Sequence, residues 1–233
     1  MALRELGSGW TPLLERLLAA FPAESALDSG FLERASRYLD LVVSWNARMD
    51  LTAAKSAEEL VDLSFADAAA IFACGALAPP TEWLDVGSGA GAPGLPLALF
   101  EPRLAMTLLE PMQKRVAFLR TAVGSLACSA KVVRGRVEDH PERAATVAIS
   151  RATLSPEAWL AAGARVATEE VWVLLARETP PELSGWSVCR DLSFEWPLTR
   201  KSRRAAAFRR GASQVRTSSP SVADQQSAPV KIR

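Results

Sequence analysis

Apolar residues in the N-terminal part of the chain recur at the spacing of helices with one buried face, and charged residues fill the positions between them. The segments with this pattern are residues 11–20, 31–49 and 57–72. Ser56 stands where a side chain would cap the start of the third helix. We therefore expect a helical cap over residues 1–80, ending at Pro79-Pro80.

From Trp83 onward, short apolar runs alternate with helical patterns. The predicted strands are 83–86, 104–109, 130–134, 146–150 and 171–176, and the predicted helices between them are 93–100, 111–124 and 156–164. Such alternation is typical of an α/β fold, with a parallel sheet and helices on both faces. Two further strands, near 186–192 and 205–210, would complete a domain over residues 81–210. Residues 211–233 are rich in Ser, Gln, Pro and Thr, which predicts a disordered tail.

The first predicted strand runs into a glycine loop with the sequence DVGSGAGAPG. Gly87, Gly89 and Ala92 fit a loose G-x-G-x-x-G/A pattern, in which the backbone turns sharply and a ligand can approach it closely. A strand, a glycine turn and a helix form a pocket at the carboxyl end of the strand, where α/β folds bind nucleotides. The loop alone fits an ordinary tight turn as well as a nucleotide site.

Two acidic residues narrow the choice of ligand. Asp85, two residues before Gly87, suits a cationic group such as the ammonium of S-adenosylmethionine better than it suits a pyrophosphate. Glu110 ends the next predicted strand, where a carboxylate could accept hydrogen bonds from ribose hydroxyls. A nicotinamide site uses an acid in the same way, so a dehydrogenase is an alternative, although His140, the one histidine, lies in a loop and is no credible hydride-site residue. Asp85 favours S-adenosylmethionine.

Composition is that of a globular protein, with 49% hydrophobic and 23% charged residues in a chain of 233. The N-terminal residues lack the layout of a signal peptide, and no apolar run is long enough to cross a bilayer, so we expect a cytoplasmic protein without a membrane partner. Cys74, Cys128 and Cys189 are scattered and lack CxxC spacing. They predict buried thiols, with no disulfide and no metal site.

A net charge of +1 conceals an uneven distribution. Residues 1–80 carry 6 Lys/Arg and 11 Asp/Glu, whereas residues 199–233 carry 9 Lys/Arg and 1 Asp/Glu. Positive charge concentrated in this way indicates a polyanionic partner, and a solubilising basic end is the alternative. Phe208 is the one aromatic residue in the basic segment that could stack on a base, so sequence-specific reading of single strands is not indicated.

Several motifs occur together in one order: DVGSGAGAPGLPLAL, TLLEPMQKRVAFLR, GRVED and ISRA, preceded by Trp45-Asn46 and Leu51-Thr52-Ala53. Over residues 35–165 the chain thereby resembles the glucose-inhibited division protein B family, the RsmG-type methyltransferases. These enzymes methylate N7 of a guanine in the 530 loop of 16S rRNA. The resemblance implies a Rossmann-like class I methyltransferase fold with an antiparallel edge, S-adenosylmethionine as cofactor, and 16S rRNA or the small ribosomal subunit as partner. We expect a monomer.

The resemblance also implies roles for individual residues. Gly87, Gly89 and Ala92 match the cofactor loop, and Glu110 matches the acid that binds the ribose. The pair beside the adenine is matched by Val137 and Glu138, whose alternative is a surface turn.

Arg151 matches the arginine of the family's Ser-Arg-Ala motif. It could contact the cofactor carboxylate or an RNA phosphate, and it is our candidate for a positioning residue; no other catalytic residue is assigned. Its alternative is a solvated arginine that caps a helix. The basic residues that we assign to RNA binding are Lys114, Arg115, Arg200, Lys201, Arg203 and Arg204, although Lys114 and Arg115 suit a solvated helix face equally well.

Two considerations bear on the identity of the methyl acceptor: the chemistry of guanine N7, and the positions at which this chain departs from the family pattern. Guanine N7 carries a lone pair and no proton, so methyl transfer needs positioning and no general base. However, Ser64 stands where the family usually has a histidine, Asp50 where it prefers asparagine, and Ala176-Arg177 where a Lys-Gly pair commonly ends the fifth strand. These changes leave two alternatives open: a methyltransferase of the same fold with a different acceptor, and a non-catalytic rRNA-binding or assembly factor.

Overall fold

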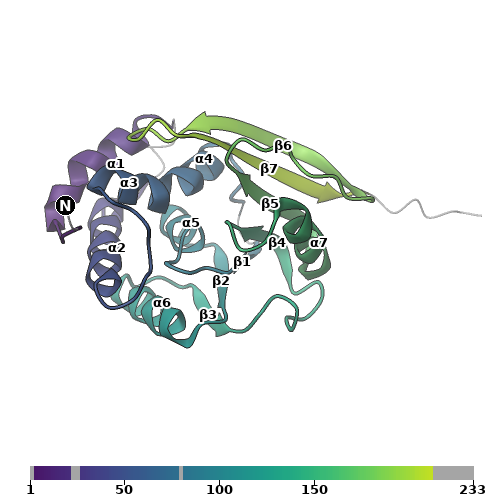
Figure 1. Cartoon of the computed structure of the whole chain (residues 1–233), viewed down its shortest axis with the longest axis horizontal. Coiled ribbons are helices and arrows are strands. Elements are labelled where there is room, and N and C mark those ends of the chain that lie inside the picture. The colour runs from purple at the N-terminus through teal and green to yellow at the C-terminus, as the bar shows by residue number, and fades with distance from the viewer. Residues whose placement is uncertain (1–2, 22–26, 79–80, 212–233) are drawn as a thin grey trace, which may run out of the picture.

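The computed structural model describes residues 3–21, 27–78 and 81–211. Pro79-Pro80, and the predicted tail after Gly211, lie outside the described residues. A single 3₁₀ turn, η1 (Gly7–Trp10), leads into the first of the helices. The N-terminal helical elements are α1 (Thr11–Leu18), α2 (Phe31–Asn46), α3 (Ala57–Val61), η3 (Asp62–Ala66) and α4 (Asp67–Ala73) (Figure 1).

The predicted third helix is present but is divided. Ser56 Oγ accepts a hydrogen bond from Glu59 N at 3.1 Å, so the predicted cap is confirmed. The helix then passes through one π turn, η3, before it continues as α4. A π turn inserts one extra residue into the helix and shifts the side chains that follow, and such turns often occur at functional sites. Apolar spacing did not reveal this turn.

Seven strands form one sheet in the order β3-β2-β1-β4-β5-β7-β6. The strands are β1 (Glu82–Val86), β2 (Ala105–Glu110), β3 (Lys131–Arg134), β4 (Ala145–Ser150), β5 (Ala167–Leu175), β6 (Trp186–Glu195) and β7 (Ser202–Arg210). The first five are parallel, whereas β6 and β7 form an antiparallel hairpin that extends the sheet beyond β5. The predicted class I methyltransferase fold is confirmed.

The edge of the sheet is longer than the apolar pattern predicts, because β5 begins at Ala167 and β7 at Ser202. Glu170 explains part of this difference. It lies opposite Arg209 of β7, and the two form an ion pair at 2.9 Å, while Glu170 Oε1 also accepts from Trp172 Nε1. An ion pair between neighbouring strands can thus extend a sheet at positions where the sequence has no apolar residues to predict a strand.

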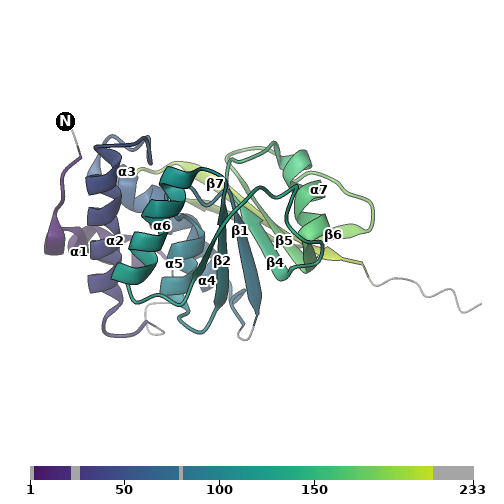
Figure 2. The ribbon, with the colours of Figure 1, turned by 90° about the horizontal axis from the view of Figure 1, so that it is seen from below.

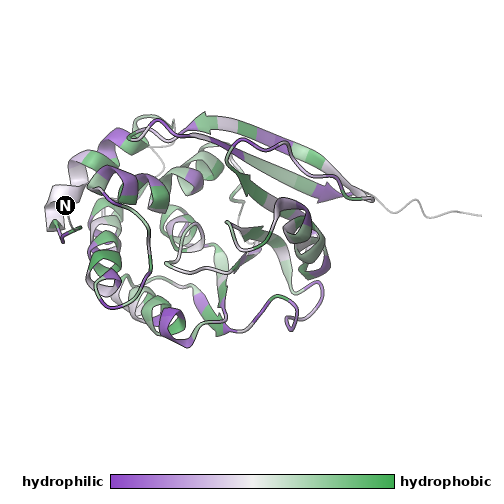
Figure 3. Ribbon diagram, in the orientation of Figure 1, coloured by the Kyte–Doolittle hydropathy of each residue, from purple (hydrophilic) through white to green (hydrophobic). Residues whose placement is uncertain are grey.

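Helices cover the two faces of the sheet unequally (Figures 1 and 2). On one face, α1 to α4 pack together with α5 (Gly94–Phe100) and α6 (Gln113–Ser125), in one hydrophobic core that includes Trp83 and Trp172. On the other face, α7 (Pro156–Val166) packs on a smaller core. Apolar colour therefore follows the strands and the inward sides of the helices (Figure 3). The N-terminal helices thus share their core with the sheet.

Candidate active site

The glycine loop between β1 and α5 has the conformation that its sequence predicts. Gly87 has φ +71°, a left-handed value that favours glycine, and a Cβ there would lie 2.2 Å from Thr153 Oγ1. Gly94 lacks this conformation but is equally crowded, since a Cβ there would lie 2.6 Å from Asp85 Oδ2. Gly89 and Gly91 also have left-handed φ values, so the loop needs glycine for its turn at several positions and at Gly94 for close approach to Asp85.

Glu110 lies at the carboxyl end of β2, beside the glycine loop. Its Oε2 accepts from Gly89 N at 2.9 Å, and its Oε1 accepts from Met112 N at 2.9 Å. The residue is 1% exposed. Because each carboxylate oxygen has a second lone pair, both can still accept from a ligand hydroxyl. The backbone thus holds the carboxylate in the orientation that a ribose would need.

A cavity of about 440 Å³ opens over this loop. The predicted cofactor residues that line it are Gly87, Gly89, Ala92, Glu110 and Arg151. Its other walls include Tyr38 of α2, Thr52, and Ser64 of η3. Tyr38 donates a hydrogen bond from its hydroxyl to Ala90 O at 2.7 Å, which ties the N-terminal helices to the glycine loop. We call this space the loop cavity.

Asp85 lies beneath the loop cavity and is 1% exposed. Its Oδ2 accepts from Gly94 N at 3.1 Å, while its Oδ1 has no hydrogen-bond partner among the described residues. Burial raises the pKa of this carboxyl to about 7, against the opposing effects of the Gly94 N–H and the Arg151 guanidinium. Asp85 thus supports the loop from below, and its predicted contact with a cofactor ammonium stays a prediction.

The raised pKa of Asp85 predicts how stability depends on pH. A carboxyl whose pKa is higher in the folded state stabilises the fold fully at low pH, and this contribution is lost as pH rises through about 7. We expect the Asp85 contribution to the free energy of unfolding to fall by up to ~4 kcal/mol between pH 4 and pH 8. Urea denaturation at several pH values gives the free energy of unfolding of the wild type and of Asp85→Asn. The difference between the two plots against pH measures the Asp85 contribution. Parallel curves would contradict this assignment.

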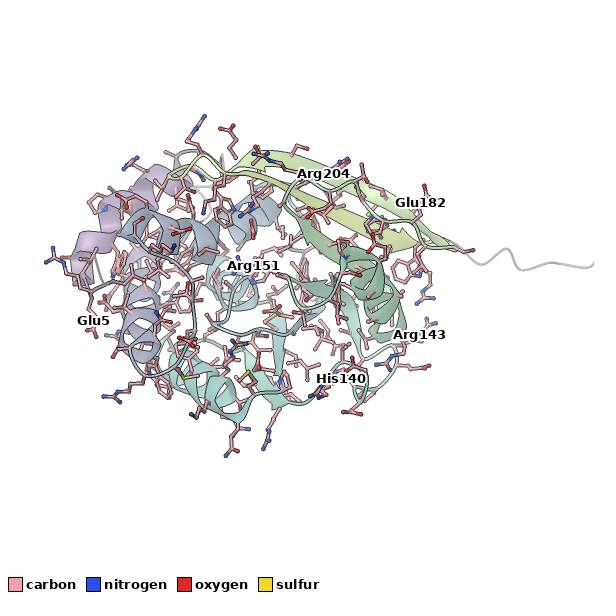
Figure 4. The ribbon with its side chains drawn as sticks, viewed as in Figure 1. Glu5, His140, Arg143, Arg151, Glu182 and Arg204 are labelled. Atoms are coloured by element: carbon pink, nitrogen blue, oxygen red, sulfur yellow. The ribbon has the colours of Figure 1, made fainter. Side chains whose placement is uncertain are left out.

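Arg151 follows β4 and lies between the N-terminal helices and the sheet, near the centre of the molecule (Figure 4). Its Nη1 donates to Leu63 O of η3 and to Asp67 Oδ2, the latter at 3.2 Å. Asp67 in turn accepts from Trp196 Nε1 at 2.9 Å. The π turn brings the Leu63 carbonyl to Arg151, so the helical segment η3–α4 holds the arginine by two acceptors, Leu63 O and Asp67 Oδ2.

A second cavity, of about 370 Å³, lies on the other side of Arg151. Leu63, Arg151, Ala152 and Thr153 line both cavities. The remaining walls come from α7, the end of β5 and the β6–β7 hairpin. We call it the hairpin cavity, because Trp196, between β6 and β7, forms one of its walls. A ligand in one cavity would meet a ligand in the other at Arg151.

Two more predicted cofactor residues, besides Asp85, do not line the loop cavity. Val137 and Glu138 lie in the turn after β3, where Val137 is buried and Glu138 is exposed. The Val137 carbonyl accepts from Arg165 Nη2. Their predicted place beside the adenine stays a prediction. His140 lies in the same loop, away from Arg151 (Figure 4).

The basic residues fall into two groups. On α6, Lys114 is exposed, whereas Arg115 lines the loop cavity and its Nε is buried without a partner among the described residues. At the hairpin, most cations have carboxylate partners: Arg200 pairs with Glu195, Lys201 with Glu59 and Arg204 with Asp191. The charge available to RNA is therefore smaller than the count of basic residues suggests.

Among the four hairpin residues assigned to RNA binding, Arg203 is the exception, since no carboxylate among the described residues forms a salt bridge with it. Its guanidinium lies 3.8 Å from the centre of the Trp196 ring, in a cation–π contact. Phe208, by contrast, is 1% exposed, so the expectation that it could stack on a base is wrong: β7 points it into the smaller core. Trp196 lies beside Lys201 and Arg203 and, although it is also 1% exposed, lines the hairpin cavity.

Sequence reasoning missed Trp196 and Glu178, which line the hairpin cavity, because neither belongs to a recognised motif. The segment from Asn46 to Thr52 could have been found from the sequence, because it contains the motifs Trp45-Asn46 and Leu51-Thr52-Ala53. Asn46 Oδ1 accepts from Leu51 N at 2.8 Å and from Thr52 N at 3.0 Å, which shapes one wall of the loop cavity.

In the part of the chain that the structure describes, no cluster of His, Cys, Asp and Glu could hold a metal, and no helix is long and apolar enough to span a membrane.

Comparison with known proteins identifies the family. Residues 31–179 match GidB, rRNA small subunit methyltransferase G. A relative of that name from Anaeromyxobacter dehalogenans (strain 2CP-C) is 31% identical over 189 residues, which cover 75% of this chain and 86% of the relative. Another from Myxococcus xanthus (strain DK1622) is 33% identical over 195 residues, with the same 75% and 86% coverage.

A solved structure of a putative RNA methyltransferase from Pyrococcus horikoshii has a TM-score of 0.50 at 14% identity, and the match covers 75% of this chain and 98% of that one. At this identity the likeness shows the fold alone. The family match over residues 31–179, in contrast, includes the residues of the loop cavity, strands β1 to β5 and Arg151. The resemblance found in the motifs is confirmed: the chain belongs to the rRNA small subunit methyltransferase G (GidB) family.

Proposed function

We propose that this chain transfers a methyl group from S-adenosylmethionine to N7 of a guanine in 16S rRNA. The observation that carries the proposal is the pair of adjoining cavities on either side of Arg151, in a chain of this family. One cavity has the glycine loop and the buried acid of a nucleoside site, and the other is open to a second ligand. A methyl transfer between two bound molecules needs this arrangement.

The residues of the loop cavity suit the cofactor. Glu110 would accept from the ribose hydroxyls, and Gly87 and Gly89 would let the adenosyl group approach the backbone. Arg115, in the cavity wall with a buried Nε that has no partner among the described residues, would meet the carboxylate of a methionyl group, and the unpartnered Asp85 Oδ1 beneath the loop would attract its ammonium. When bound, S-adenosylmethionine supplies a methyl group that its sulfonium makes electrophilic.

Catalysis by this chain then consists of positioning. Guanine N7 has no proton to remove, and correct alignment of two reactants is worth about 7–11 kcal/mol of the barrier. Arg151, held by Leu63 O and Asp67, is the residue best placed to align them. An enzyme that acts on the ribosome works in the cytoplasm, and its partner would be 16S rRNA, free or in the small subunit.

Incubation of the protein with small ribosomal subunits and tritiated S-adenosylmethionine tests the proposal. Subunits from a bacterium that lacks this methyl group serve as the substrate. We expect label in 16S rRNA and, after nuclease digestion and mass spectrometry, 7-methylguanosine as the product. A methyl group on another atom would support the alternative of a different acceptor, which Ser64 in the cavity wall favours. Cofactor binding without methylation of any acceptor would support an assembly factor.

RNA binding should depend on salt through cations that form no salt bridge with the carboxylates of the described residues, among them Arg203 and the exposed Arg177 just after β5. We expect Arg177→Gln with Arg203→Gln to weaken RNA binding and to reduce the slope of log K against log salt by about 2, because each lost phosphate contact reduces it by about 1. Filter binding over a range of KCl concentrations measures this slope. Arg143→Gln, an exposed arginine distant from the hairpin (Figure 4), is the control that should leave it unchanged. Equal slopes for the wild type, the double variant and Arg143→Gln would support the alternative that the basic end only solubilises the protein.

A further inference from the structure

We propose that the hairpin cavity is the site of the acceptor base, and that Glu178 selects guanine there by accepting hydrogen bonds from its N1–H and 2-amino groups. This inference rests on the proposed function and names the substrate-reading residue of the same site. It depends on the position of the cavity, on the way Glu178 is held, and on the chemistry of the purine edges.

The position of the cavity suits a base that meets the cofactor. It shares Arg151, Ala152 and Thr153 with the loop cavity, so the two ligands would lie edge to edge. Its volume of about 370 Å³ is within the range of small-molecule sites. Trp159 and Trp196 lie among apolar walls that could enclose a planar ring. Single-stranded bases are bound in such apolar slots, with polar groups at one edge.

Glu178 follows the end of β5 and supplies a carboxylate to the wall of this cavity. Its Oε2 accepts from Ala176 N at 2.8 Å and from Arg177 N at 2.9 Å. Its Oε1 accepts from none of the described residues. Backbone N–H groups, together with the Arg203 charge, hold the pKa of Glu178 below its usual range. Glu178 is therefore an ionised, oriented acceptor with one free oxygen and no donor.

Such a group distinguishes the bases. Guanine presents two adjacent donors, N1–H and the 2-amino group, and a carboxylate can accept from both. Adenine presents an acceptor, N1, beside its 6-amino donor, so the lone pair of N1 would face the negative charge. When Glu178 binds this edge of guanine, N7 lies on the opposite side of the ring. The base would then point N7 away from Glu178 and toward the loop cavity.

Binding of GMP and AMP to the protein saturated with S-adenosylhomocysteine tests the inference, because the loop cavity is then filled. We expect the wild type to bind GMP about 10- to 100-fold more tightly than AMP, the discrimination that paired hydrogen bonds to a base provide. Glu178→Gln should abolish this preference or reverse it. The glutamine keeps an oxygen for Ala176 N and Arg177 N, so the turn is preserved, but it places an amide donor where Oε1 was.

Glu182→Gln is the matched control, an exposed glutamate in the same β5–β6 connection that does not line the cavity (Figure 4). It should keep the preference for GMP, and all three proteins should bind S-adenosylhomocysteine equally. Methylation of small subunits by Glu178→Gln should fall by a similar factor in kcat/KM. Equal GMP-to-AMP ratios in the wild type and Glu178→Gln would overturn the inference. A wild type that prefers GMP yet makes no 7-methylguanosine would instead overturn the proposed function.

Discussion

Glu110→Ala is expected to weaken S-adenosylmethionine binding by roughly 100-fold, close to the largest effect of any single substitution in the loop cavity. The carboxylate would accept from two ribose hydroxyls, and hydrogen bonds to a charged group contribute about 1.5–3 kcal/mol each. The alanine would also leave Gly89 N and Met112 N without their acceptor, so the loop itself would lose its support. Titration calorimetry with S-adenosylmethionine and S-adenosylhomocysteine measures the affinity.

Glu110→Gln separates these two contributions. Its amide oxygen can still accept from one backbone N–H, but it removes the charge and one acceptor. We expect an intermediate affinity, about 10-fold below the wild type. Urea denaturation of both variants shows whether the loop has been destabilised as well. If Glu110→Ala bound the cofactor as tightly as the wild type, Glu110 would not contact the ribose and the orientation of the nucleoside would have to be reversed.

The parallel sheet and the glycine loop could be predicted because local patterns determine them. Trp83, Leu84 and Val86 form an apolar run, and Gly87 and Gly89 follow at once, so the strand, the turn and the pocket at its end are all encoded within a few residues. Glu110 could be placed by the same logic, since it ends the next strand. Asp85 favoured S-adenosylmethionine as the ligand, and the family motifs supported that prediction.

The hairpin side of the site could not be predicted, because contacts between distant segments create it. Asp67 meets Trp196 across 129 residues, and Arg151 meets Leu63 across 88. Asp62 accepts from Leu198 N and Thr199 N, and thereby fixes the hairpin to the π turn. None of these pairs has a local pattern. The π turn itself is decided by this packing, since it presents Asp62 and the Leu63 carbonyl to their partners.

The contacts between the π turn, Arg151 and the β6–β7 hairpin help to interpret the positions at which this chain departs from the family pattern. Ser64 belongs to the π turn and lines the loop cavity, whereas Ala176 and Glu178 line the hairpin cavity. Of the residues that differ from the family pattern, Ser64 and Ala176 thus lie in the walls of the two cavities that meet at Arg151, whereas Asp50 and Arg177 line neither cavity. The glycine loop and Glu110 keep the expected arrangement. We therefore expect the cofactor side to follow the family, and the chain's own features to concern how the acceptor is held.

Arg151→Ala should reduce the kcat of rRNA methylation by about 100-fold, because misplacement of reacting groups by about 1 Å costs a factor of this size. The guanidinium lies on the wall that both cavities share, and its removal would leave the cofactor and the base without their common contact. We expect the affinity for S-adenosylhomocysteine to change by less than about 10-fold, since Glu110 and the glycine loop remain. Single-turnover methylation of small subunits at saturating cofactor measures the chemical step.

Asp67→Asn distinguishes positioning by Arg151 from a purely structural role. The asparagine keeps an oxygen for Trp196 Nε1 but loses the charge that pairs with Arg151 at 3.2 Å. Both variants should lose stability, because removal of either partner leaves a largely buried charge unpaired. Only Arg151→Ala should lose most of the methylation rate, whereas Asp67→Asn, in which Leu63 O still holds the guanidinium, should lose less than about 10-fold. Equal losses of rate in the two variants would mean that Arg151 acts only by joining the π turn to β4, and that another group aligns the base with the methyl donor.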